Sequence, residues 1–241
     1  VAERIEQLGV SLAPSFEIKR VFERVELDSE QTPANAKLLT DLVGPIRQGF
    51  KSQHESENLK GDHCLLDNDT DKDLFDAADR IFSFSIGSRA YWIVNTQCLQ
   101  GSGAFLYENT YLITRNGPHY TLFDLKKITS EDDNKFAGGG WSADASRIRV
   151  FGLTGTTVAI TSPLAEESKL VDVTKPESAP VRLPLVDAAL VNDMRFTGDR
   201  SHIVQINSDG RFYILKTADG TQVLSGTYAD DEVVIAAKDG R

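Results

Sequence analysis

The sequence is poor in sulfur and has no long hydrophobic run. Its 241 residues include two cysteines and one methionine. Two cysteines can form at most one disulfide, so a disulfide framework and a four-cysteine metal site are excluded. The longest apolar stretches, residues 90–94 and 233–237, are far shorter than the roughly 20 residues that a transmembrane helix needs. We therefore expect neither a membrane-spanning helix nor a cysteine-based scaffold.

Basic side chains are also in the minority. Lysine and arginine total 26 against 36 aspartates and glutamates, which gives a formal net charge of −10. A field of that sign repels phosphodiester backbones and anionic lipid headgroups. We expect no nucleic acid and no membrane among the partners of this chain. We expect instead a protein partner whose surface is neutral or basic.

The start of the sequence bears on its origin. It opens at Val1, and its only methionine is Met194, so we expect a processed product or an excised piece of a longer protein. No basic-then-apolar signal segment opens it, and the low cysteine count favours a reducing compartment. We expect a cytoplasmic protein, and the alternative is an exported protein whose signal has been removed.

The first eighty residues differ in pattern from the rest. Apolar residues recur near helical spacing in residues 16–25 and again in residues 38–46. Pro33 suits the first turn of the second helix. Residues 51–73 are charged and poor in apolar side chains, which is typical of an exposed connection. We predict a helical N-terminal segment with an acidic linker over residues 1–80.

From residue 81 onward the pattern is that of β-strands. Apolar and aromatic runs of roughly 4–8 residues alternate with Asn-Gly, Asp-Gly and Gly-Asp turn signals. The sequence therefore predicts a mainly β domain of antiparallel strands over residues 81–241. The predicted strands cover residues 81–86, 90–95, 104–107, 111–115, 119–125, 147–152, 157–161, 170–174, 189–196, 202–207, 211–216, 222–225 and 232–236.

This β region repeats itself. Residues 141–148, Trp-Ser-Ala-Asp-Ala-Ser-Arg-Ile, align with residues 196–203, Phe-Thr-Gly-Asp-Arg-Ser-His-Ile, at an offset of 55. The match continues without a gap, so that Gly155 aligns with Gly210. A third copy, residues 105–112, leads into an Asn-Gly turn in the same way. Each copy predicts an aromatic, a polar turn, a strand, a glycine hairpin and another strand, with the hairpin glycine at positive φ.

Residues 196–224 resemble one blade of a WD-repeat β-propeller. The shared pattern is an aromatic, a polar turn with aspartate, a strand, a Ser-Asp-Gly hairpin, a second strand and an Asp-Gly-Thr turn before an outer strand. The signature Trp-Asp pair is absent, and Lys216-Thr217 and Phe123-Asp124 stand in its place. The resemblance implies β-propeller-like blades over residues 81–241, about three to four of them. Closed propellers have roughly 4–8 blades. We therefore expect either that this chain is a piece of a longer propeller, with the missing segment closing the ring, or that a second chain or an unusual N-terminal segment closes it.

The resemblance implies binding rather than catalysis. We expect a non-catalytic scaffold that mediates protein–protein interaction within a larger signalling or regulatory protein. Residues 230–241 resemble the segment that follows the last blade in bacterial proteins of that kind. Repeat proteins bind through equivalent loops of successive units. The predicted binding residues are Glu108, Asp144 and Asp199 in these loops, and Trp141 beside them. The alternative is a propeller hydrolase or lyase whose channel site is completed outside this chain.

No motif in the sequence predicts a catalytic residue, a metal or a cofactor. Asp67, Asp69, Asp71 and Asp73 alternate as in a calcium loop, but Lys72 stands where that loop needs glycine. The position of the bidentate glutamate is also occupied by an alanine. We interpret the run as a solvated acidic turn. The neighbouring His63 and Cys64 have no second Cys-His pair at ligand spacing, and the Gly-Gly-Gly run at residues 138–140 lacks the following Lys-Ser/Thr of a phosphate loop.

Overall fold

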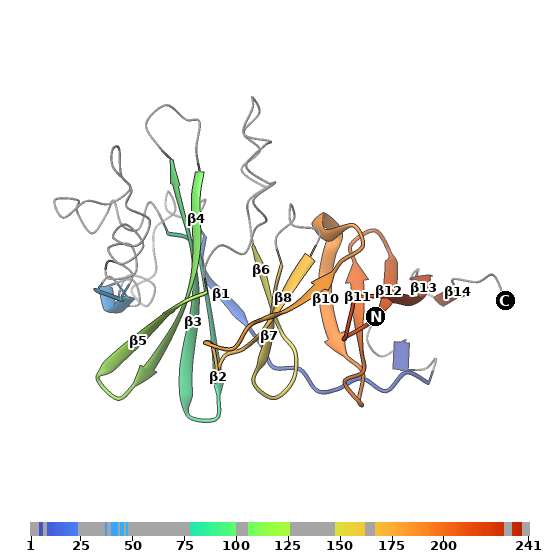
Figure 1. Ribbon diagram of the computed structural model, residues 1–241, viewed down its shortest axis with the longest axis horizontal. Coiled ribbons are helices and arrows are strands. Elements are labelled where there is room, and N and C mark those ends of the chain that lie inside the picture. Colours follow the sequence, from blue (N-terminus) through green and yellow to red (C-terminus); the bar gives the residue numbers. More distant parts are fainter. Residues whose placement is uncertain are drawn as a thin grey trace. The chain divides into compact units, whose positions relative to one another are not determined.

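A computed structural model gives the fold, which is mainly β. It describes residues 5–6, 9–23, 37, 40–42, 44–45, 47, 78–99, 106–125, 148–161, 167–228 and 233–237. The chain divides into two compact units: unit 1 comprises Val1–Glu17 and Ile148–Arg241, and unit 2 comprises Ile18–Arg147. The described strands form three antiparallel sheets, each with its strands in sequence order (Figure 1). These three sheets confirm the predicted antiparallel β architecture but do not form a closed propeller within the described residues.

Unit 2 contains one five-stranded sheet. Its strands are β1 (Lys19–Glu23), β2 (Ala78–Ile86), β3 (Arg89–Leu99), β4 (Leu106–Asn116) and β5 (His119–Asp124). Gly87 and Gly117 make the tight turns after β2 and β4, and both have a φ of 60°. Phe84 stacks on the cross-strand Tyr91 with ring centroids 5.4 Å apart. Aromatic cross-strand pairs of this kind stabilise a sheet.

Unit 1 contains two sheets that follow one another along the chain. The middle sheet consists of β6 (Arg149–Gly152), β7 (Thr157–Thr161), β8 (Glu167–Asp172) and β9 (Val181–Pro184). A short 3-10 helix, η3 (Ala188–Leu190), leads into the C-terminal sheet. That sheet consists of β10 (Val191–Phe196), β11 (His202–Asn207), β12 (Arg211–Lys216), β13 (Gln222–Tyr228) and β14 (Val233–Ala237).

The C-terminal sheet has an apolar core on each face. One core is shared with the middle sheet. In it, Ala159 and Leu170 of the middle sheet pack with Ile203 and Leu215 of the C-terminal sheet. The core on the other face contains Val204, Ile206, Phe212 and Ile214, and the N-terminal segment covers it with the fully buried Ile5. We call this second side the outer face of the C-terminal sheet.

Main-chain hydrogen bonds fix the N-terminal segment to the end of β10. Leu12 forms an isolated antiparallel bridge with Thr197. The amide of Ala13 donates to the carbonyl of Phe196 at 2.9 Å, and the amide of Gly198 donates to the carbonyl of Ser11 at 2.8 Å. The first residues of the chain therefore belong to the same core as its last strands.

The two aligned repeats both form antiparallel strands joined by a hairpin, but in different registers. Phe151 pairs with Ala159, whereas Ile206, which aligns with Phe151, pairs with Phe212. Gly155 and Gly210 precede β7 and β12, and their φ angles are 61° and 84°. Ile148 and Ile203, which align at the offset of 55, are both fully buried. Both glycines have the predicted positive φ, but their predicted equivalence is wrong. Gly155 lies inside a turn that the Thr157 amide closes by donating to the Thr154 carbonyl, whereas the amide of Gly210 itself donates to the carbonyl of Asn207. The strands predicted at residues 157–161, 202–207 and 211–216 have the predicted ends.

The prediction of a helical segment over residues 1–80 is not supported. Residues 5–6, 37, 40–42, 44–45 and 47 have helical backbone, but Lys19–Glu23 forms strand β1 and pairs with β2. The run Lys-Arg-Val-Phe-Glu also reads as a strand, and pairing with a long neighbour decides between the two patterns. The predicted boundary near residue 80 falls inside β2, and the linker at residues 51–73 lies outside the described residues.

Two other strand predictions need correction. Residues 106–116 form one continuous strand, β4, where two strands and a loop were expected. The reason is the length of β3, which supplies paired residues along the whole of β4, so that Glu108 lies opposite Gln97. The short strand β9 was missed because it carries Arg182 and ends in Pro184. Among the described residues, no helix is long and apolar enough to cross a membrane.

Candidate functional site: a groove beside the Asp199 turn

The structure places one of the four predicted binding residues in an exposed turn. Asp199 lies between β10 and β11, as predicted, and is exposed. Glu108 lies within β4, so its prediction as a loop residue is wrong. Asp144 and Trp141 lie outside the described residues. The description of the site therefore starts from Asp199.

Hydrogen bonds from its neighbours fix the Asp199 carboxylate. Its Oδ1 accepts from the hydroxyl of Thr197 at 2.6 Å and from the amide of Ser201 at 3.0 Å, and its Oδ2 accepts from the hydroxyl of Ser201 at 2.7 Å. Aspartate at this position folds the chain locally because its side chain satisfies an amide two residues later. Arg200, in the centre of the turn, has a φ of 59°.

These hydrogen bonds also determine the charge of the turn. The hydroxyl of Thr197, followed by the hydroxyl and the amide of Ser201, lowers the pKa of Asp199 from 3.8 to about 2. Hydrogen bonds that favour the ionised form of a carboxyl always act in this direction. Asp199 therefore carries a full negative charge throughout the physiological pH range.

Ser201 links this carboxylate to an imidazole. Its Oγ lies 2.7 Å from Nδ1 of His202 as well as 2.7 Å from Oδ2 of Asp199. The ionised carboxylate can only accept, so the single hydroxyl proton points to Asp199 and Nδ1–H of His202 donates to Oγ. In a catalytic triad the serine proton goes to the imidazole. The order of donors here is the reverse, so Ser201 is not arranged as an activated nucleophile.

A groove opens beside this turn on the outer face of the C-terminal sheet. Its volume is about 670 Å³. The floor is apolar, made by the buried Ile214 of β12 and the half-buried Val223 and Leu224 of β13. The lining is completed by residues of the N-terminal segment, the turn and the start of β11, namely Val10, Ser11, Thr197, Gly198, Asp199 and His202. The groove combines an apolar floor with a charged carboxylate at its rim, and it lies entirely within unit 1.

Asp199 differs from other turn-forming aspartates of unit 1 because it lines the groove. Asp172, Asp209 and Asp219 each accept from the amide two residues later, at 3.0, 3.1 and 2.9 Å. This shared bond is structural. None of those three lines the groove, whereas Asp199 does. Asp219 is therefore a natural control residue for any role assigned to Asp199.

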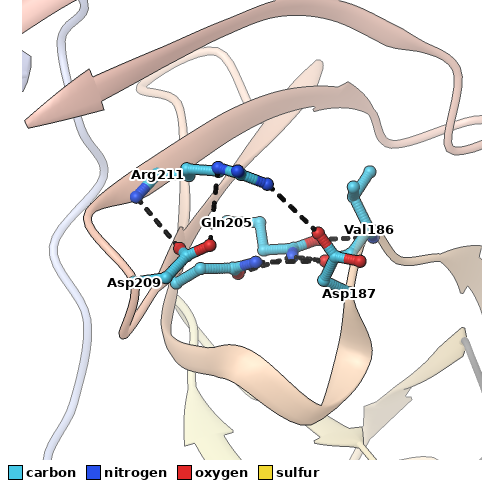
Figure 2. Close-up of polar contacts among 6 residues, drawn as sticks. Val186, Asp187, Gln205, Asp209 and Arg211 are labelled. Atoms are coloured by element: carbon cyan, nitrogen blue, oxygen red, sulfur yellow. Dashed lines mark hydrogen bonds and ion pairs between the residues drawn. The ribbon is translucent and has the colours of Figure 1, made fainter.

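A second polar cluster lies at the connection between β9 and β10 (Figure 2). Gln205 and Asn207 of β11 are fully buried. Both side-chain amides donate to the carbonyl of Val186, the Asn207 bond measuring 3.2 Å, and Oε1 of Gln205 accepts from the Val186 amide at 3.2 Å. Nε2 of Gln205 also donates to Oδ1 of Asn207 at 2.7 Å. This cluster satisfies buried backbone groups, and its role is to hold the connection in place.

An exposed arginine completes that cluster. Arg211 lies 3.5 Å from Asp209 and 3.8 Å from Asp187, and its own amide donates to Asp209. Asp187 has a φ of 50° at the start of η3. Exposed ion pairs of this length contribute little stability. We assign this surface network to the shape of the connection rather than to ligand binding.

The described residues include no group of three or more histidine, cysteine, aspartate or glutamate side chains that could hold a metal ion. The aspartate run at residues 67–73, His63 and Cys64, and the glycine run at residues 138–140 lie outside the described residues. The interpretation of the aspartate run as a solvated acidic turn therefore stays a prediction.

Sequence reasoning missed most of the groove. His202 was predicted only as part of the strand at residues 202–207, and no sequence pattern marks Ser11, Ile214, Val223 or Leu224 as binding residues. The groove brings together four stretches of chain, and their pairing follows from tertiary structure. One local signal was available, since His202 follows a turn whose aspartate was already a predicted binding residue.

The comparisons with known proteins give no family. No family model matches this chain, and no curated protein matches its sequence. Two solved structures of the acylaminoacyl peptidase of Pyrococcus horikoshii, one uncomplexed and one in an orthorhombic crystal form, are similar to 64% of this chain. Both have a TM-score of 0.34, with sequence identities of 10% and 11%. The matched part spans about a quarter of the peptidase, 27% and 26% of its length. At that TM-score the similarity carries no argument about fold or function.

Proposed function

We propose that this chain is a non-catalytic interaction module that binds a protein partner through the groove and the turn at Asp199. The observation that carries the proposal is the groove itself, about 670 Å³ with an apolar floor beside an ionised carboxylate. Binding sites of roughly 300–1,000 Å³ combine an apolar lining with a few polar groups that fix orientation.

The packing of the two sheets supports propeller-like blades of the WD-repeat kind. Phe151 and Ala159 of the middle sheet pack in the core that both sheets share. Ile203 and Leu215 of the C-terminal sheet pack in the same core. Two antiparallel sheets that follow one another along the chain and share a core resemble successive units of a repeat.

The two faces of the C-terminal sheet are covered differently. One face packs against the middle sheet. The outer face is covered by the N-terminal segment, and the groove is the part that this segment leaves open. An open apolar surface of this kind is what protein partners use.

The test compares proteins retained by three immobilised chains from an extract of the native host. Leu224→Lys places a charged side chain on the groove floor, and Thr227→Lys places it on an exposed position of the same strand outside the groove. We expect a partner retained by the wild type and by Thr227→Lys but not by Leu224→Lys. Identical retention by all three chains, or retention of no protein by the wild type, contradicts the proposal. A thermal melt of each variant confirms that it is folded.

Salt dependence gives a second readout of the same proposal. An ionised rim residue on a chain of net charge −10 speeds association with a neutral or basic partner. We expect the association rate to fall as salt rises, because screening shortens the reach of the attraction. Asp199→Lys should reduce both the rate and its salt dependence. An association rate that changes neither with salt nor with Asp199→Lys contradicts the electrostatic part of the proposal.

A further inference from the structure

We infer that the groove recognises an extended segment of the partner in which a lysine or arginine lies two residues from a leucine, isoleucine or valine. This inference rests on the proposed function, because it names the chemistry of the partner at the same groove. Its parts are the acceptor at Asp199, the apolar floor and the N-terminal segment that covers part of the outer face.

The Asp199 carboxylate has room for one more donor. A carboxylate offers about four acceptor positions. Oδ1 uses two of them, for Thr197 and the Ser201 amide, and Oδ2 uses one, for the Ser201 hydroxyl. One position of Oδ2 remains among the described contacts. An ammonium or a guanidinium can donate to it, and such charge-assisted bonds are the stronger kind of hydrogen bond.

No lysine or arginine forms an ion pair with Asp199 within the described part of the chain. The five ion pairs found among the described residues do not include it. Arg200 is adjacent in sequence, but its Nη2 lies 3.8 Å from where a Cβ on Gly155 would stand, at the hairpin of the middle sheet. Arg200 does not line the groove. The negative charge at the rim is therefore available to a basic side chain from outside.

The floor suits the apolar part of the same segment. Ile214, Val223 and Leu224 lie beneath the rim, so the aliphatic stem of a lysine or arginine can lie along them while its charged end reaches Asp199. In an extended chain, side chains two residues apart point to the same side. A basic residue and an aliphatic residue with that spacing therefore both face the groove.

The present cover of the outer face indicates the size of the ligand. One N-terminal stretch, with Ile5, Val10 and Leu12, packs over this core. Val10 and Ser11 form one wall of the groove. The remaining space lies beside that stretch and above half-buried strand residues, which fits one further extended segment rather than a whole sheet.

The test is a selection of random heptapeptides displayed on phage against the full chain. Wild type, Asp199→Asn and Asp219→Asn are compared. Asparagine at position 199 keeps Oδ1 for Thr197 and Ser201, and its Nδ2 can donate to the Ser201 hydroxyl, so the turn retains its hydrogen bonds. Asp219 folds a similar turn outside the groove. We expect wild type and Asp219→Asn to select a basic residue two positions from an aliphatic one, and Asp199→Asn to lose the basic preference.

Binding of the best selected peptide then gives the size of the effect. We expect Asp199→Asn, or norleucine in place of the basic residue, to raise the Kd about five-fold, as a partly exposed charge pair predicts. The two changes together should raise it no further, because each removes the same contact. Selected peptides without a basic residue, or equal selection by Asp199→Asn, overturn this inference and leave the proposed function standing. Selection of no peptide by the wild type also overturns this inference, and the retention experiment decides the proposed function separately.

Discussion

The middle and C-terminal sheets of unit 1 align in sequence but differ in what their aligned positions contact. Gln205 and Asn207 of the C-terminal sheet are buried amides that bind the backbone of Val186. At the offset of 55, the middle sheet has Val150 and Gly152 instead. A Cβ on Gly152 would lie 2.2 Å from the carbonyl oxygen of Phe16, so the N-terminal segment crosses closely there.

This comparison distinguishes residues of the repeat that set the strands from residues that fit each sheet to its neighbour. The hairpin glycines and the buried aliphatic residues set the strands and recur in both copies. The residues at the end of the first strand adapt each sheet to its own neighbour, a connecting loop in one case and the N-terminal segment in the other. The Asp199 groove belongs with this second group, since it depends on how the outer face is covered.

The largest expected effect comes from placing a side chain where the middle sheet has none. In Gly152→Ala, the new Cβ collides with the backbone of Phe16, which cannot move away as a flexible side chain does. We expect a loss of about 3 kcal/mol in the free energy of unfolding, measured in urea, as for severe overpacking. Gly198→Ala is the control, because its Cβ would meet the mobile Oγ of Ser11 at 3.1 Å. Equal stability of the two variants contradicts the close crossing.

A smaller effect is expected when the C-terminal sheet is given the residue of the middle sheet. Gln205→Val, which copies Val150, removes the partner of the Val186 amide. An unsatisfied buried amide costs about 1–3 kcal/mol, so we expect unfolding to become easier by about 2 kcal/mol. Gln222→Val, at a half-buried position of β13, is the control and should change stability little. A Gln205→Val variant as stable as the wild type would show that the amide cluster is dispensable.

The hairpin glycines should rank in a defined order. A side chain at positive φ costs on the order of 1 kcal/mol, so Gly155→Val and Gly210→Val should both lower the Tm. Gly210→Val should lower it more, because a Cβ there would lie 3.0 Å from the carbonyl oxygen of Tyr228, whereas the space around Gly155 is open to 3.8 Å. An unchanged Tm at either site would contradict the positive φ of that glycine.

The smallest effect concerns acid. The folded-state pKa of Asp199, about 2, lies below its ordinary value of 3.8, so ionised Asp199 stabilises the folded state at neutral pH. That contribution is fully present above about pH 4 and is lost as the pH falls through about 2. The stability difference between wild type and Asp199→Asn should shrink over this range, as followed by urea unfolding. Carbon NMR of the carboxyl should give a midpoint near the folded value, and a midpoint near 3.8 would contradict the hydrogen bonds of the turn.

Much of unit 1 could be predicted because its turns are determined by the residues within them. The Asn-Ser-Asp-Gly sequence before Arg211 both ends β11 and starts β12, so the predicted strands at residues 202–207 and 211–216 have the right ends. Local sequence failed where a neighbour decided the outcome. Lys19–Glu23 became a strand by pairing with β2, and Glu108 entered the ladder because β3 is long.

The candidate site was predictable in one residue only. Asp199 could be predicted because its turn recurs with the repeat and an aspartate there has a local partner. The floor at Ile214, Val223 and Leu224 could not, because these are ordinary apolar strand residues. Their partial exposure depends on how far the N-terminal segment extends over the outer face.

The split composition of unit 1 has a consequence for synthesis on the ribosome. Ile5, Val10 and Leu12 are made first, yet the strands that they cover, β11 to β13, are made after residues 18–147 have been added. Unit 2 is continuous in sequence and can fold as soon as it emerges, because domains fold as units during synthesis. The early apolar segment must wait unpaired until β13 is complete. Chaperones that protect nascent chains should therefore bind this segment during translation and release it when the outer face forms.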